Sequence, residues 1–218
     1  LKIRSYCPHC KHQLRWLDLI PVLSFFILKG RCRYCHEKIS IQYPLVELAT
    51  GILFLLFFEV RPPGIDIWEV GPLFIVPFLV IIFVYDLKHY LILDKIIYPA
   101  IILTLVYDLL RFDLLASGNL LISAFGAAAF FLAIVLISKG RWMGAGDIKL
   151  AFFMGLVLGW PNSLVALFFA FLSGAIIGTG LVLAEKKSFK SEVPFGPFLV
   201  SSCICIWFLL LYHLPLPL

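Results

Sequence analysis

The sequence predicts an all-α polytopic membrane protein that carries a small polar domain at its N-terminus. Of the 218 residues, 62% are hydrophobic and only 14% are charged, whereas soluble domains carry about 25% charged residues. The mean hydropathy of +1.02 is too high for a single water-facing core in a chain of this length. The apolar runs are continuous over helical lengths, so helices are expected to cross the bilayer. Lipid is therefore expected to surround most of the chain.

Residues 1–44 differ in composition from the rest of the chain. They hold eight of the eighteen Lys and Arg residues and four of the six cysteines, so we expect a polar domain outside the bilayer. Residues 45–218 are expected to form the transmembrane domain, in which tilt lets short runs span the bilayer. Seven apolar runs follow one another there: 45–60, 71–85, 96–112, 118–138, 148–160, 163–184 and 196–215. Because the chain starts at Leu1 and not at Met, an N-terminal piece is expected to be missing from it.

The distribution of cations predicts the orientation of these helices. Counting crossings puts every Lys and Arg except Arg61 and Arg111 on one side of the membrane, in residues 1–44 and in the connections 88–95, 139–149 and 186–190. Cytoplasmic segments carry the excess of Lys and Arg in membrane proteins. The polar N-terminal domain is therefore predicted to be cytoplasmic. The net charge of +5 is interpreted as this orientation signal, with the lipid bilayer as partner, and not as a nucleic-acid-binding surface.

Two cysteine pairs of identical spacing predict a metal site in the polar domain. Cys7-Pro-His-Cys10 and Cys32-Arg-Tyr-Cys35 each place two thiols on one tight turn, which is typical of a zinc-binding domain related to the zinc ribbon. A cytoplasmic location favours bound zinc over disulfides. A redox-active pair is the alternative, and three nearby histidines could replace a cysteine as ligands: His9, His12 and His36. Cys203 and Cys205 lie in the last apolar run and are interpreted as buried apolar residues.

Two aspartates at the ends of apolar runs are candidate catalytic residues. Acidic residues beside hydrocarbon are costly and need a reason to be there. Two apolar runs separate Asp86 from Asp147, and an even number of crossings returns the chain to the same face. Both carboxyls are thus predicted at the cytoplasmic membrane edge, where Gly144 and Gly146 permit close approach of the backbone.

Such a pair can hydrolyse a peptide bond without a Ser or Cys nucleophile. Two neighbouring carboxyls do not both ionise easily, so one acts as the acid while the other acts as the base that activates water. The alternative is structural: both aspartates could be helix-end residues paired with one of three lysines, Lys88, Lys95 or Lys149. Residue spacing alone leaves these two interpretations open.

The chain as a whole resembles the type IV prepilin peptidases, which are bifunctional leader peptidases and N-methyltransferases. The resemblance rests on the two cysteine pairs together with five further segments: Asp18-Leu-Ile-Pro-Val-Leu-Ser24, Lys29-Gly30-Arg31-Cys32, Tyr43-Pro44 with Glu47-Leu48 and Gly51, Asp86-Leu-Lys88, and Gly144-Ala-Gly146-Asp147-Ile-Lys149-Leu150. It implies eight membrane helices with a cytoplasmic zinc-binding insertion after the first, so the first of the eight helices is expected to be missing from this chain, which shows seven apolar runs. Leu93 departs from the family pattern, which usually has Pro before Asp94, and Asp94 is therefore interpreted as structural.

The resemblance also implies the chemistry. Asp86 and Asp147 would be the catalytic aspartates, within a loop motif that includes Gly144, Gly146 and Lys149, and structural zinc would bind the four cysteines. The substrates would be prepilins or pseudopilins cleaved at the bacterial inner membrane, with S-adenosylmethionine as donor for methylation of the new N-terminus. Gly30 and Glu47 match family positions and are the candidates for the methyl-transfer site. The sequence shows no glycine-rich nucleotide loop, so the methyl-donor site cannot be derived from it.

Two other functions stay open at the level of sequence. Tyr85-Asp86 together with Gly144-Ala-Gly146-Asp147 also resembles the motifs of presenilin-like intramembrane proteases, although the cysteine domain argues against that class. The second alternative is a non-catalytic zinc-ribbon scaffold or transporter subunit. The sequence does not indicate the oligomeric state or the identity of the client pilin.

Overall fold

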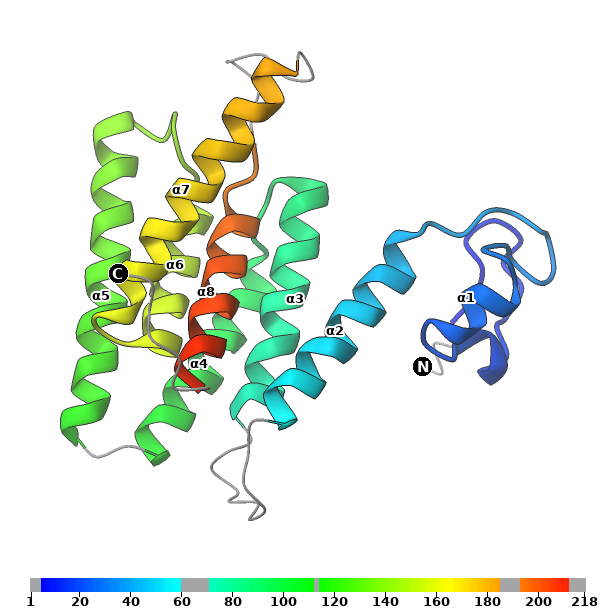
Figure 1. Ribbon diagram of the computed structural model, residues 1–218, viewed down its shortest axis with the longest axis horizontal. Helices are drawn as coiled ribbons and strands as arrows, with labels where there is room; N and C mark the ends of the chain where they lie inside the picture. The colour runs from blue at the N-terminus through cyan, green and yellow to red at the C-terminus, as the bar shows by residue number, and fades with distance from the viewer. Residues whose placement is uncertain (1–4, 60–70, 112–113, 185–192, 212–218) are drawn as a thin grey trace. The chain divides into compact units, whose positions relative to one another are not determined.

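The computed structural model describes residues 5–59, 71–111, 114–184 and 193–211, and it is helical (Figure 1). Its elements are a short 3-10 helix, η1 (Trp16–Leu19), followed by α1 (Leu23–Ile27), α2 (Gln42–Glu59), α3 (Gly71–His89), α4 (Asp94–Arg111), α5 (Leu114–Ser138), α6 (Ala145–Leu158), α7 (Asn162–Leu183) and α8 (Gly196–Leu211). The described residues contain two isolated β-bridges and no strand. The all-α prediction is confirmed, since each of the seven expected apolar runs corresponds to one helix, α2 to α8.

The chain divides into two compact units, Leu1–Glu59 and Val60–Leu218. The first unit contains the four paired cysteines and α2, and the second contains α3 to α8. A functional boundary after residue 44 stays a prediction. Among the cations used to predict the orientation, six lie outside the described residues: Lys2, Arg4, Arg61, Lys186, Lys187 and Lys190.

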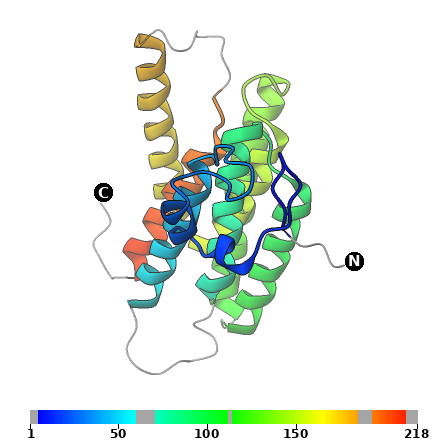
Figure 2. The same cartoon turned by 90° about the vertical axis from the view of Figure 1, so that its right-hand side faces the viewer.

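Helix α6 lies at the centre of the second unit and packs against α4, α5, α7 and α8 (Figures 1 and 2). Its side chains Leu150, Phe153 and Met154 are fully buried. Close packing against α5 depends on Gly155, because a Cβ at this position would lie 2.4 Å from the Cα of Ala124. The hydroxyl groups of Ser123 in α5 and Ser163 in α7 are hydrogen-bonded at 2.8 Å. These contacts hold α5, α6 and α7 in fixed register.

The outer surface of the second unit is apolar. Two helices have the length and hydropathy of a membrane span, Ser117–Ser138 and Asn162–Leu183, and α8 is a shorter apolar helix, as is α2 in the first unit. Ile122 and Ile137 of α5 and Phe168 and Ile176 of α7 are all more than 60% exposed. Such exposure is unfavourable in water and favourable in lipid. This surface supports a membrane location, while the number of seven spans stays a prediction.

Candidate functional site

The two cysteine pairs form the same backbone turn twice. The N–H of Cys7 donates to the carbonyl oxygen of His12 at 3.0 Å, and the N–H of Lys11 donates to that of Cys7 at 2.8 Å. The second pair repeats this pattern: the N–H of Cys32 donates to Glu37 at 2.8 Å, and the N–H of His36 donates to Cys32 at 3.0 Å. One antiparallel bridge closes each turn. We call these turns the first knuckle (6–13) and the second knuckle (31–38).

The four thiols of the knuckles converge on one point. The sulfur atoms of Cys7, Cys10, Cys32 and Cys35 all lie within 4.8 Å of one another, and those of Cys7 and Cys35 are 3.8 Å apart. Four sulfurs around a tetrahedral zinc ion at about 2.3 Å would be about 3.8 Å apart, whereas disulfide sulfurs lie at about 2.05 Å. The donor set therefore fits a zinc site with four cysteine ligands, and all four thiols are free.

The electrostatics of the knuckles also suit a cation. Backbone N–H groups of Cys10 and His9 lower the pKa of Cys7 to about 6. A hydrogen bond from Glu37 lowers the pKa of Cys35, but desolvation and the neighbouring thiols outweigh it and raise this pKa to about 12. Four crowded thiols thus do not all ionise unless a positive charge lies among them.

Of the nearby histidines, none joins the metal-ligand group within the described part of the chain. The ring of His12 instead packs against the ring of Tyr34, with 3.6 Å between the ring centroids. Replacement of a cysteine ligand by histidine therefore has no support in this structure.

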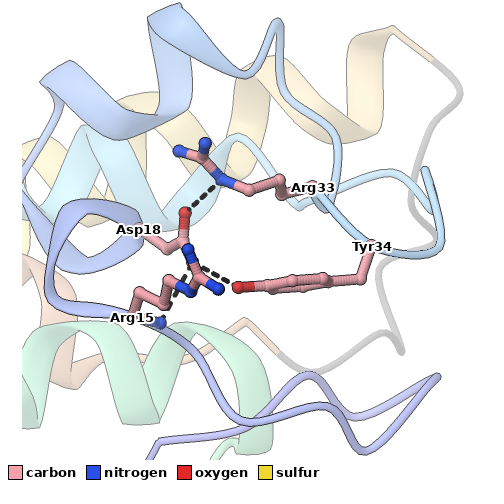
Figure 3. A network of polar contacts seen from close by, with 4 residues as sticks. All are labelled: Arg15, Asp18, Arg33 and Tyr34. Carbon is pink, nitrogen blue, oxygen red and sulfur yellow. Dashed lines mark hydrogen bonds and ion pairs between the residues drawn. The ribbon is translucent and has the colours of Figure 1, made fainter.

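Asp18 anchors the second knuckle (Figure 3). Its Oδ1 accepts a hydrogen bond from Nε of Arg33 at 2.7 Å, and its Oδ2 accepts from the backbone N–H of Arg15 at 3.0 Å and from the hydroxyl of Tyr34 at 3.4 Å. Although burial raises the pKa of Asp18, the hydrogen bonds from Arg15 and Arg33 outweigh it and hold that pKa below its ordinary value. Because Arg33 and Tyr34 lie between the two cysteines of the second knuckle, Asp18 connects that knuckle to η1.

The candidate methyl-transfer residues, Gly30 and Glu47, hold the segment between the knuckles. Oε2 of Glu47 accepts the N–H of Val22 at 2.7 Å, and Val22 has an unusual φ of 61°. Gly30 has a φ of +68°, and a Cβ there would lie 3.0 Å from the ring of Phe25. Both residues stabilise strained or tightly packed backbone. Their contacts do not form a methyl-donor site, so no step through such a donor is derived from them.

The structure brings Asp86 and Asp147 together. Asp86 lies near the end of α3 and Asp147 in the first turn of α6, at the end of the bundle that is uppermost in Figure 1. Asp86 is only 5% exposed, and its charge acts on the carboxyl of Asp147. Two acids from distant parts of the sequence thus lie within electrostatic reach of each other.

The glycines around Asp147 set the geometry of the loop before α6. The N–H of Gly144 donates to Oδ2 of Asp147 at 3.2 Å, which caps the start of the helix. Gly146 lets the first turn pack against the loop after α3, because a Cβ there would lie 3.1 Å from Cβ of Ile92. This short motif therefore fixes the orientation of the Asp147 carboxyl.

Gly196 is a site residue that the sequence analysis missed. Its backbone N–H donates to the carboxyl of Asp86, and a Cβ on Gly196 would lie 2.5 Å from Oδ2 of Asp86. Only glycine permits this approach of the start of α8 to the aspartate. The segment Pro194-Phe-Gly196-Pro197 is typical of a turn that leads into a helix, and this signal could have marked the position.

The lysine of the loop motif has a different partner. Nζ of Lys149 lies 2.5 Å from Oδ1 of Asp94 and 4.9 Å from the ring centroid of Tyr98. Within the described residues, neither Asp86 nor Asp147 forms an ion pair with a lysine. The structure therefore disfavours the interpretation of these two aspartates as helix-end partners of Lys88, Lys95 or Lys149.

Comparison with known proteins assigns both parts of the chain. Residues 1–60 match the bacterial peptidase A24 N-terminal domain, and residues 73–179 match the type IV leader peptidase family. A prepilin leader peptidase/N-methyltransferase of Aeromonas hydrophila is 35% identical over 214 residues, which cover 96% of this chain and 71% of that protein. The Bacillus subtilis protein of the same name is 34% identical over 204 residues, covering 92% of this chain and 79% of its own length. No solved structure matches the chain.

Proposed function

We propose that this chain, which belongs to the type IV leader peptidase family, cleaves the short basic leader peptide from prepilins or pseudopilins with Asp86 and Asp147 as its catalytic pair. The names of its relatives support the substrate class. The observation that carries the catalytic assignment is the meeting of these two carboxyls beside the N–H groups of Gly144 and Gly196.

The hydrolytic step uses one ionised and one protonated aspartate. The ionised carboxyl takes a proton from a water molecule, whose oxygen forms a bond to the scissile carbonyl carbon while the protonated carboxyl gives its proton to the carbonyl oxygen. The C–N bond then breaks while the leaving amine takes the proton that the first carboxyl received from water. A hydroxyl group of the tetrahedral intermediate gives its proton back to the other carboxylate as the carbonyl re-forms, which restores the pair. The hydrogen bonds from Gly144 and Gly196 orient the two carboxyls for these transfers.

The membrane itself contributes to substrate binding. An apolar segment of the prepilin would lie in the bilayer, with the leader in the cytoplasm and the scissile bond at the membrane edge. We infer that the end of the bundle with Asp86 and Asp147 faces the cytoplasm, and that the cysteine unit lies on the same side, in the bacterial inner membrane. Confinement of enzyme and substrate to one plane raises their effective concentration.

Zinc is proposed to have a structural role in the first unit. Cys7, Cys10, Cys32 and Cys35 would hold it with no position left for water, as in closed structural sites. We also propose that the chain transfers a methyl group from S-adenosylmethionine to the new N-terminus, since the names of the relatives include N-methyltransferase. The donor would supply the methyl group. The contacts of Gly30 and Glu47 do not identify the residues that would bind it.

Mass spectrometry of a co-expressed prepilin tests cleavage and methylation together. Wild type should yield a shortened pilin with a methylated N-terminus. Asp86→Asn and Asp147→Asn should each reduce cleavage by at least about a thousandfold, since each removes one partner of the proton transfers. Asp94→Asn is the matched control, because its carboxyl lies on α4 and bonds Lys149. Normal processing in either of the first two variants would contradict the catalytic assignment.

The presenilin-like alternative makes a different prediction for the substrate. An intramembrane protease would cut within the apolar helix whether or not a leader is present. We expect a pilin whose leader has been deleted to stay intact, and the intact and deleted substrates can be compared in the same membranes. Cleavage of the deleted substrate within its helix would favour the alternative.

A further inference from the structure

The segment from η1 to α1 exposes an unusual number of apolar side chains. Trp16 is 74% exposed, Phe26 is 70% and Ile27 is 63%, and three further side chains are exposed: Leu17, Leu19 and Leu23. The segment lies between the two knuckles, and nothing in the described part of residues 1–59 covers these side chains. Such surfaces mark sites of interaction in folded proteins.

The charged residues of this segment are exposed cations at its ends and one acid with a buried side chain between them. Arg15 and Lys29 lie exposed at its two ends, and Arg31 is exposed just beyond. Between them the only acid is Asp18, whose side chain is 2% exposed and bound to Arg33. Within the segment, cations and apolar groups therefore face outward and its own carboxyl faces inward, while the exposed carboxylate of Glu47 is engaged with the N–H of Val22.

We propose that residues 15–31 dock the cysteine unit onto the anionic surface of the bilayer. Trp16, Phe26 and Ile27 would enter the interface between headgroups and acyl chains, where Trp and Phe are favoured, and the guanidinium and ammonium groups would contact lipid phosphates. The exposed cations complement anionic headgroups, and the exposed apolar side chains beside them suit the boundary with the acyl chains, so the combination fits this occupant better than a neutral apolar protein face. The proposal rests on the proposed function only in placing the unit beside a membrane.

The knuckle geometry explains why this segment is suited to docking. Asp18 fixes one of its turns through Arg33, and Glu47 fixes the other through the N–H of Val22. The backbone is therefore held by contacts that do not use the exposed apolar side chains. Docking then needs little further ordering of the segment, which reduces the entropic cost of binding.

Photocrosslinking of the full-length chain in nanodiscs tests the docking. Benzoylphenylalanine replaces Phe26 in one variant and Tyr6, an exposed aromatic residue on the first knuckle (60% exposed), in the control variant. Nanodiscs contain phosphatidylcholine alone or with about a quarter phosphatidylglycerol. We expect mass spectrometry to find lipid adducts at position 26 in clear excess over position 6, with the higher yield in phosphatidylglycerol.

Three results would overturn the proposal. They are equal lipid adduct yields at positions 26 and 6, a crosslink from position 26 to peptides of residues 60–218 in place of lipid, and no adduct at position 26. The second result would identify the other unit as the occupant of the segment.

A charge variant sharpens the lipid assignment. Arg15 contributes its backbone N–H, not its guanidinium, to the Asp18 network, so Arg15→Gln leaves that network intact. Each removed cation, in Arg15→Gln and Lys29→Gln, should reduce the preference for phosphatidylglycerol discs by about fivefold. An unchanged preference in the double variant would contradict the role of these cations.

Prepilin cleavage, measured in the same nanodiscs, separates this proposal from the proposed function. Cleavage without lipid adducts at position 26 would overturn the docking while supporting the peptidase. Lipid adducts without any cleavage would support the docking and count against the peptidase.

Discussion

The cysteine unit and the helical unit are held together by different forces. In the described part of the first unit the buried apolar side chains are Cys7, Cys32, Pro44 and Phe57, so order there depends on polar contacts, on the knuckle turns and on the proposed metal. In the second unit α6 alone buries Leu150, Phe153 and Met154. The first unit therefore depends on hydrogen bonds and on the proposed metal, whereas the second depends on close packing of helices.

The largest expected effect comes from removing cysteines in the first unit. We expect the wild type to hold about one equivalent of zinc, and Cys7→Ser together with Cys32→Ser should abolish its binding. Amide exchange of residues 5–40 should then rise strongly, because little apolar core remains to order them. Exchange in α5 to α7 should stay as in wild type.

Metal analysis and hydrogen exchange on the purified protein measure both effects. Cys203→Ser is the control, since Cys203 is buried in α8 and outside the metal-ligand group. Undiminished zinc in the double variant would show that the knuckles are not the metal site.

A substitution in α6 should destabilise the helical unit and leave the cysteine unit unchanged. Gly155→Ala places a Cβ against the backbone of Ala124, which cannot move as a flexible side chain would. We expect a loss of about 1–3 kcal/mol in stability, seen as a lower melting temperature in detergent with zinc content unchanged. Gly126→Ala, on α5 with no atom within 4 Å of the new Cβ, should be neutral or slightly stabilising. Equal melting of both variants would contradict the close packing of α5 and α6.

A substitution at Gly196, beside Asp86, should affect the activity more than the stability. Gly196→Ala pushes against the carboxyl of Asp86 and should reduce the kcat of prepilin cleavage by about tenfold to a hundredfold, since small displacements of reacting groups are costly. KM should change little, because the substrate still partitions into the membrane. Gly178→Ala, on α7 in open space, is the matched control. Full activity of Gly196→Ala would show that the contact does not position Asp86.

The smallest expected effect is at Asp18. Asp18→Asn weakens the hydrogen bonds to Arg33 and Arg15, with a loss of about 1–2 kcal/mol that chelator titration should show as easier zinc release. Because the folded pKa of Asp18 lies below its ordinary value, the stabilisation is complete above about pH 4 and declines as the pH falls through the folded pKa. The difference between variant and wild type should therefore shrink in acid. A difference that instead grows in acid would contradict the ion pair.

The sequence predicted much of the fold because the signals are local. Continuous apolar runs predicted α2 to α8, and the matched spacing of the cysteines predicted the knuckle turns. The sequence did not indicate that Lys149 bonds Asp94, since three lysines and several acids were equally available in its polar segments. Nor did it show that Glu47 bonds the N–H of Val22, because that contact depends on the path of the loop between them.

By itself the sequence determined the helical class, the four-cysteine donor set and the identity of the two candidate catalytic acids. These features depend on residue type and on short spacings along the chain, and both can be taken directly from the sequence. Only the tertiary structure decided which groups surround the acids: Gly196 lies more than a hundred residues after Asp86 in the chain, yet its N–H reaches the carboxyl of that residue. Such contacts arise from how helices pack, and the packing is fixed by many side chains at once.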